Sequence, residues 1–299
     1  MQQKSAKLLV DVGSGLRFAK CPRWFHQRLI FLDVHDRSIK STDMEGTVRT
    51  ELDLSYLPGG LGVLPAGELL VGDAWRRILH RLGKTRQEQV ADLSHVARYC
   101  LSDAIVVSRC GIYLADVGYD FLNPLVDPAP QGTIVLVNDR GRVSLVAKDL
   151  FYPNGMVITP DEKTLIVAET LGHRLTAFDI AKDGSLSKRR LWAKLPDNVN
   201  PDGICLDGEG AIWAATTTPK ALRILEGGQI VDEVVAEQSV FAVMLGGPQC
   251  KHLFMCTSDS SDPIITRRSP SASIEVATVN ISGESVSPDQ AAGYRSVMP

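Results

Sequence analysis

Internal repetition is the sequence feature that most narrows the fold of this chain. Six segments share one plan: a short apolar strand, a turn rich in Gly, Pro or Asp, and a second apolar strand. Successive segments start 39 to 51 residues apart, close to the about 40–50 residues of a four-stranded propeller blade. The repeat therefore predicts an all-β chain that folds as a six-bladed β-propeller. The segments start at Phe18, Gly60, Asp103, Asn154, Asp202 and Phe241.

The two ends of the repeat region indicate how the blades are completed. A ring of blades must close, because an open sheet edge is prone to pair with other chains. The segment Lys7–Val12 has no strand ahead of it in the sequence, and Ser273–Ile281 needs an outer partner. We predict that these segments pair in one blade. Residues 7–281 then form a single propeller domain, and the polar residues 282–299 form a loose tail.

Composition excludes several classes of partner. The net charge of -3, without a run of Lys or Arg, gives no reason to expect nucleic acid. No apolar run reaches the about 20 residues of a membrane span, and the N-terminal residues contain no signal-peptide core, so we expect a cytoplasmic protein without a membrane partner. Six scattered cysteines without a C-x-x-C pair predict reduced, mostly buried thiols. The sequence indicates no oligomeric state.

Polar residues occur where the first strand of several blades begins. In a propeller these first strands line the central channel, so their starts converge at one mouth of the channel. Asp or Asn at a strand start often only bonds nearby backbone N–H groups, but several polar residues on one ring favour a small-molecule site. The residues concerned are Lys20, Ser102, Asp103, Asn154 and Asp202.

A long connection in the third blade is a second candidate feature. Residues 118–132 form a proline-bearing excursion, which can act as a lid with Tyr119 and Asp120 reaching the substrate. An ordinary surface loop is the alternative. Arg98 precedes the Ser102 strand start and is a candidate for binding an anionic substrate group. With Ser102 and Asp103, these residues form the predicted substrate-binding set.

Four motifs carry a resemblance to a known family. They are Cys21-Pro22-Arg23-Trp24, Pro153-Asn154-Gly155, Pro201-Asp202-Gly203 and the segment Phe241–Pro248. Together they resemble the regucalcin (senescence marker protein) and gluconolactonase family, over roughly Gly15 to Thr257. The resemblance implies a six-bladed propeller. The family also implies a divalent cation such as calcium, zinc or magnesium, which many relatives hold at the channel mouth. This cation promotes lactone hydrolysis.

This chain departs from the family at the metal site. The family's ligands are a Glu before Pro-Arg-Trp, the Asn of Pro-Asn-Gly and the Asp of Pro-Asp-Gly. Asn154 and Asp202 match the last two and would be the ligands of any bound metal, but Lys20 replaces the Glu. A divalent ion needs several oxygen ligands, and at 4 Å each unit of like charge costs about 4 kcal/mol at an effective dielectric of ~20. We therefore expect no metal cofactor, with the Lys20 ammonium hydrogen-bonded to Asp202 and Asn154. At a second position of the site, this chain has Ser102-Asp103 where the family tends to carry Asn-Asp.

Three functions remain open for a site built from Lys20, Asp202 and Asn154. The first is a metal-independent, lactonase-like hydrolase, in which Lys20 polarises a carbonyl and Asp202 activates water. The second is a carbon–carbon lyase or isomerase that forms a Schiff base at Lys20. The third is a non-catalytic propeller that binds a small molecule, with Lys20 and Asp202 as a plain ion pair. Analogy with the family favours the hydrolase.

Overall fold

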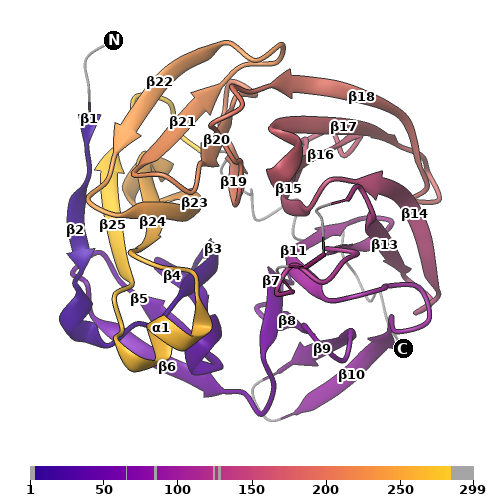
Figure 1. Ribbon diagram of the computed structural model, residues 1–299, viewed down its shortest axis with the longest axis horizontal. Coiled ribbons are helices and arrows are strands. Elements are labelled where there is room, and N and C mark those ends of the chain that lie inside the picture. Colours follow the sequence, from indigo (N-terminus) through magenta and orange to yellow (C-terminus); the bar gives the residue numbers. More distant parts are fainter. Residues whose placement is uncertain (1–3, 65, 84–85, 124, 127–128, 284–299) are drawn as a thin grey trace. The chain divides into compact units, whose positions relative to one another are not determined.

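Strands dominate the computed structural model, which describes residues 4–64, 66–83, 86–123, 125–126 and 129–283, with backbone only for 103–107. The described residues form 25 strands, one short α-helix and four 3-10 helices (Figure 1). They divide into two compact units. Among the described residues, unit 1 contains 4–58 and 193–283, and unit 2 contains those between 59 and 192. No described helix combines the length and the hydropathy needed to cross a membrane.

Unit 1 contains three antiparallel blades. The first blade consists of β3 (Ala19–Phe25), β4 (Arg28–Asp33), β5 (Ser38–Thr42) and β6 (Val48–Asp53). The second consists of β19 (Ile204–Leu206), β20 (Ile212–Ala215), β21 (Lys220–Ile224) and β22 (Ile230–Val235), and β1 (Lys4–Ser5) adds in parallel to β22. The third consists of β23 (Ser239–Gly246), β24 (His252–Ser258), β25 (Ser273–Thr278) and β2 (Lys7–Val10).

Unit 2 contains three further blades of the same design. They are β7 (Pro58–Val63), β8 (Leu69–Asp73), β9 (Ile78–Leu82) and β10 (Gln87–Asp92); β11 (Leu101–Ser108), β12 (Gly111–Asp116), β13 (Gly132–Asn138) and β14 (Val143–Leu150); and β15 (Pro153–Ile158), β16 (Thr164–Glu169), β17 (Arg174–Ile180) and β18 (Leu186–Lys194). A single parallel bridge between Leu61 and Ala104 joins the first two into one eight-stranded sheet.

Six blades in the described residues give this chain the fold of a six-bladed β-propeller, as the repeat predicts. The predicted pairing of the two end segments is also confirmed, because β2 runs antiparallel to β25 with Lys7 opposite Val276. The boundaries of a single domain stay a prediction. Most of the predicted tail, residues 284–299, lies outside the described residues. Its first residues contact unit 1, where Gly283 donates its N–H to the Cys250 carbonyl.

Buried carboxylates fix the start of the first strand in several blades. The second strand ends in an acidic residue that is at most 2% exposed in four blades, at Asp33, Asp73, Asp116 and Glu169. In three of them the carboxylate accepts backbone N–H groups that precede the first strand of the same blade. Phe18 N donates to Asp33 at 2.9 Å, Tyr99 N to Asp116 at 3.0 Å and Phe151 N to Glu169 at 2.7 Å. These bonds hold the segments from which the predicted site residues project.

Apolar side chains between neighbouring blades form the core. In unit 1, Trp213 and Met255 pack in one cluster, and Phe31 and Phe254 in another. In unit 2, Tyr113 packs with residues of the following blade. Four of the six cysteines are buried, in agreement with the predicted mostly buried thiols. Burial raises the pKa of the Cys205 thiol to about 12, which keeps it protonated and unreactive at neutral pH.

Candidate active site

The first strands of the blades are irregular where they begin. The pairing register shifts between Lys20 and Arg23 in β3, and between Val240 and Ala242 in β23. Cys21, which follows Lys20, has a φ of 54°, in the left-handed region that side chains other than Gly rarely adopt. Such bulges re-aim side chains at strand ends. The irregularity in β3 therefore sets the direction in which Lys20 points.

Lys20 and Asp202 form a buried ion pair within unit 1. The Lys20 Nζ donates to Asp202 Oδ1 at 2.6 Å and to the Phe241 carbonyl at 3.1 Å. The two residues are 4% and 5% exposed. The Phe18 ring centroid lies 5.9 Å from the same nitrogen, close enough for a cation–π contribution. The charged pair is thus screened from water on several sides, which strengthens its electrostatic interaction.

The loop that carries Asp202 is fixed against β20 and β23. Asp202 N donates to the Ala215 carbonyl at 2.9 Å, and Gly203 N donates to the Phe241 carbonyl at 3.1 Å. A Cβ on Gly203 would lie 2.8 Å from the Ala242 Cα, a distance that real contacts do not allow. The glycine of the Pro-Asp-Gly motif is therefore required for close backbone approach. Because the Phe241 carbonyl also accepts from Lys20, one oxygen aligns both members of the pair.

Asn154 belongs to unit 2, where it is the second residue of β15. It is 6% exposed, and its Nδ2 donates to Thr170 Oγ1 at 3.3 Å. Its Oδ1 is buried and has no hydrogen-bond partner within the described residues. A buried acceptor without a partner needs an explanation, and a ligand hydroxyl or amide is one. The predicted hydrogen bond from Lys20 to Asn154 stays a prediction.

The predicted substrate-binding residues of unit 2 have the following surroundings. Ser102 donates its Oγ to the Pro153 carbonyl at 2.9 Å, and the side chain of Asp103 lies outside the described residues. The exposed Arg98 donates its backbone N–H to Asp116 at 2.9 Å.

The two predicted residues of the excursion after β12 contact aromatic residues. Tyr119 is 6% exposed, with its ring 6.1 Å from that of Tyr152. Asp120 accepts from the Tyr99 hydroxyl. Their roles in binding stay predictions.

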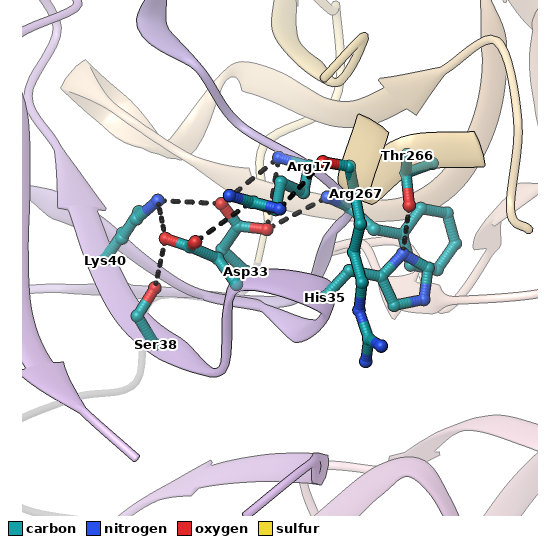
Figure 2. A network of polar contacts seen from close by, with 9 residues as sticks. Arg17, Asp33, His35, Ser38, Lys40, Thr266 and Arg267 are labelled. Atoms are coloured by element: carbon teal, nitrogen blue, oxygen red, sulfur yellow. Dashed lines mark hydrogen bonds and ion pairs between the residues drawn. The ribbon is translucent and has the colours of Figure 1, made fainter. Parts of the chain in front are cut away.

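Sequence reasoning missed a polar network beside Phe18. The His35 ring stacks on Phe18 at 4.8 Å, and its Nδ1 lies 2.6 Å from Thr266 Oγ1 in helix α1 (Pro263–Arg268) (Figure 2). Burial, reinforced by the nearby Arg267, lowers the pKa of His35 to about 4. The imidazole is therefore neutral at neutral pH. An isolated His after a strand gives no motif from which this contact could be predicted.

The same network anchors the start of the first blade. Figure 2 shows Lys40 facing the Asp33 carboxylate, at 2.8 Å. Lys40 also donates to Asp36 at 2.8 Å, and Arg17 reaches the Arg267 carbonyl at 3.0 Å. These bonds tie the segment before β3 to the β4–β5 turn and to α1. Phe18, and through it the surroundings of Lys20, is held in place by them.

Comparison with known proteins identifies the family. The model of the SMP-30/Gluconolactonase/LRE-like region matches residues 18–259. The chain belongs to this family. The resemblance inferred from the motifs is thereby confirmed, and the match covers all six repeated segments.

Curated relatives of the chain include plant proteins and bacterial lactonases. Protein STRICTOSIDINE SYNTHASE-LIKE 4 of Arabidopsis thaliana is 28% identical over 210 residues, which are 68% of this chain and 53% of the relative. Lactonase drp35 of Staphylococcus aureus (strain MRSA252) is 28% identical over 137 residues, 44% of this chain and 40% of the relative. The 6-deoxy-6-sulfogluconolactonase of Pseudomonas putida is 26% identical over 131 residues, 42% and 45% of the two. The chain thus spans about half the length of the curated relatives it matches.

Solved structures similar to the chain support the fold. A luciferin-regenerating enzyme has a TM-score of 0.76 at 17% identity, covering 93% of this chain and 98% of the other. The calcium-binding protein regucalcin of Agrobacterium tumefaciens has a TM-score of 0.75 at 15% identity, and the match covers 94% of this chain and 96% of the other. A gluconolactonase of Xanthomonas campestris has a TM-score of 0.72 at 23% identity, and the match covers 91% of this chain and 89% of the other. At these identities the likeness shows the fold alone.

The residues at the family's metal-ligand positions do not fit a divalent cation in unit 1. Where the family has a Glu, Lys20 places an ammonium 2.6 Å from the Asp202 oxygen that a cation would need. Among the described residues, no group of three or more His, Cys, Asp or Glu side chains could hold a metal ion. Calcium takes six to eight oxygen ligands, and magnesium takes six. A lysine can supply only N–H donors.

Proposed function

We propose that this chain is a lactonase-type hydrolase that works without a divalent cation. The observation that carries the proposal is the buried contact of 2.6 Å between the Lys20 ammonium and the Asp202 carboxylate. Membership of the gluconolactonase family and lactonases among the relatives support the reaction class. The fixed positive charge supports the absence of a metal cofactor. A cytoplasmic location and a small-molecule substrate as the partner stay predictions.

The proposed reaction uses each member of the pair for one task. A water oxygen attacks the lactone carbonyl carbon while Asp202 accepts a proton from that water. Lys20 donates a hydrogen bond to the carbonyl oxygen and stabilises its developing negative charge. The ring C–O bond then breaks, and the proton held by Asp202 passes to the leaving oxygen. The product is a hydroxy acid.

Asn154 of unit 2 is proposed separately, as a group that positions the substrate. Its buried Oδ1 has no partner in the described part of the chain, and it can accept a hydrogen bond from a substrate hydroxyl or amide. Its Nδ2 is engaged with Thr170, which fixes the orientation of the amide. An Asn154→Ala variant should therefore raise KM more than it lowers kcat.

The test is hydrolysis of a panel of lactones by the purified protein with and without EDTA. Turnover should survive EDTA, and Lys20→Met and Asp202→Asn should each lower kcat by about 10²–10⁴-fold, the usual contribution of such groups. Lys220→Met is the matched control, because Lys220 forms an exposed ion pair with Glu233 at 3.1 Å. Loss of activity in EDTA with recovery on adding calcium would contradict the proposal.

The lyase and the binding protein are the two other outcomes of this experiment. A Schiff base needs the Lys20 nitrogen to attack a carbonyl carbon, whereas this nitrogen is hydrogen-bonded to the Asp202 carboxylate at 2.6 Å, so the contact supports the hydrolase. Trapping of Lys20 by borohydride with a carbonyl substrate would favour the lyase. Ligand binding without turnover of any panel member would favour the binding protein.

A further inference from the structure

Four aromatic side chains form a continuous row in unit 2, which we call the aromatic row. The ring centroids of Trp75 and Tyr99 are 5.3 Å apart, those of Tyr99 and Phe121 are 5.8 Å apart, and those of Phe121 and Tyr152 are 5.4 Å apart. All three contacts are edge-to-face, with interplanar angles between 68° and 88°. Such contacts are favourable beyond the area they bury.

The row gathers residues from three blades at one end of their strands. Trp75 follows β8 and Phe121 lies in the connection after β12, so both come after the second strand of a blade. Tyr99 precedes β11 and Tyr152 precedes β15, so both come directly before a first strand. In an antiparallel blade the second strand ends where the first strand begins. The row therefore lies at the same end of these blades as Asn154.

The row is open to solvent. Trp75 is 39% exposed and Phe121 is 38% exposed, while Tyr99 and Tyr152 are half-buried. Single exposed apolar residues are common on protein surfaces and need no explanation. A contiguous row of four rings contributed by four separate segments is different, because contiguous apolar surface typically marks a binding site.

Polar bonds hold the row in place. Arg77 donates from one nitrogen to the Trp75 carbonyl at 3.0 Å and to the Tyr99 carbonyl at 2.9 Å, which ties the two backbone segments together. The Tyr99 hydroxyl donates to Asp120, the residue before Phe121. A surface held in its binding conformation in this way loses little entropy when a ligand binds.

The far end of the row is linked to Asn154. Thr170 donates its N–H to the Tyr152 carbonyl at 3.0 Å, and its hydroxyl accepts from Asn154 Nδ2 at 3.3 Å. Thr170 therefore bonds both the backbone of Tyr152 and the amide whose Oδ1 has no partner in the described residues. The row and the buried acceptor are thus connected through Thr170 within unit 2.

We propose that the aromatic row binds the flat, uncharged ring of the substrate, so that the chain prefers aryl-fused lactones to polyhydroxylated sugar lactones. This inference rests on the proposed lactonase function. A sugar lactone needs a hydrogen-bonding group for each hydroxyl, whereas the row presents mainly ring surface. The Tyr99 hydroxyl and the Asp120 carboxylate are already bonded to each other.

The experiment separates binding from turnover. The binding probe is 3,4-dihydroquinolin-2-one, an aryl-fused lactam that resists hydrolysis, and the two substrates are dihydrocoumarin and glucono-δ-lactone. Trp75→Ala and Phe121→Ala should each weaken lactam binding about 5- to 10-fold, the size expected for one aromatic contact plus its lost area. Both should raise KM for dihydrocoumarin similarly. Trp75→Phe, which keeps a ring, should restore most of the affinity.

Leu191→Ala is the matched control, because Leu191 is an apolar residue of β18 that is 59% exposed and lies outside the row. It should leave lactam binding unchanged. Unchanged lactam binding in Trp75→Ala and Phe121→Ala, or a higher kcat/KM for glucono-δ-lactone than for dihydrocoumarin, would overturn the inference. Lactam binding that depends on the row, without hydrolysis of either lactone, would support the ring site and contradict the proposed function.

Discussion

Breaking the Lys20–Asp202 pair should cost more stability than any exposed ion pair in the chain's described part. At 2.6 Å and an effective dielectric of about 20, the attraction between the two charges is about 6 kcal/mol. Desolvation of both groups offsets part of it, since they are only 4% and 5% exposed. Removing one partner leaves the other buried without its counter-charge. Lys20→Met should therefore lower the free energy of unfolding by about 3–5 kcal/mol.

A double-mutant cycle isolates the interaction. Urea unfolding of Lys20→Met, Asp202→Asn and the double variant should give a coupling energy of at least about 2 kcal/mol, because the double variant leaves no buried charge. The control cycle uses Lys220→Met and Glu233→Gln, an ion pair at 3.1 Å with partly exposed side chains, whose coupling should stay below about 1 kcal/mol. If the Lys20 and Asp202 effects add within about 0.5 kcal/mol, the buried pair does not exist in solution.

Three further predictions concern the metal, pH and the buried carboxylates. Elemental analysis should find no stoichiometric divalent cation in the wild type and bound cation in Lys20→Glu; calcium, zinc or magnesium in the wild type would refute this reading. Because burial lowers the pKa of His35 from 6.5 to about 4, the unfolded chain binds the proton first, and stability should fall by about 1–2 kcal/mol as pH drops from 6.5 to 4. Urea unfolding of a His35→Gln variant at several pH values should no longer show this fall in stability, and an unchanged fall would assign the pH dependence to another group. Glu169→Gln should cost about 3 kcal/mol in the same assay, since Arg174 and Arg189 bond this fully buried carboxylate at 2.7 and 3.1 Å, and a loss below about 1 kcal/mol would show that it does not anchor its blade.

Blade-level architecture could be predicted from the sequence because it depends on local patterns. Apolar runs separated by Gly-, Pro- or Asp-rich turns specify antiparallel pairs, and their repetition every 39 to 51 residues specifies the blades. The pairing of β2 with β25 followed from the need of each segment for a partner. Each of these inferences used only neighbouring residues or the unpaired ends of a repeat.

Side-chain contacts between blades could not be predicted in the same way. The Lys20–Asp202 bond joins residues 182 positions apart, and its geometry depends on the register shift after Lys20 and on the left-handed Cys21. No periodicity marks such a bulge. The sequence predicts that the excursion after β12 can bring Tyr119 and Asp120 to a substrate. Its partners within the structure, Tyr99 and Tyr152, depend on three-dimensional packing that a single sequence does not display.

Stability alone does not explain why a buried lysine and carboxylate stand at the start of these strands. Replacing a buried ion pair with apolar residues of similar volume is often neutral or stabilising by about 1–4 kcal/mol, so the pair is not the most stable solution for this position. Cys21 adds a left-handed backbone that costs about 1–3 kcal/mol. A polar pair that is not the most stable solution, next to a strained backbone, is typical of a site kept for binding or chemistry. A Lys20→Met/Asp202→Leu variant should therefore unfold at a urea concentration equal to or above that of the wild type while losing all lactone hydrolysis. If it kept full activity, the pair would be structural and the catalytic centre would lie elsewhere.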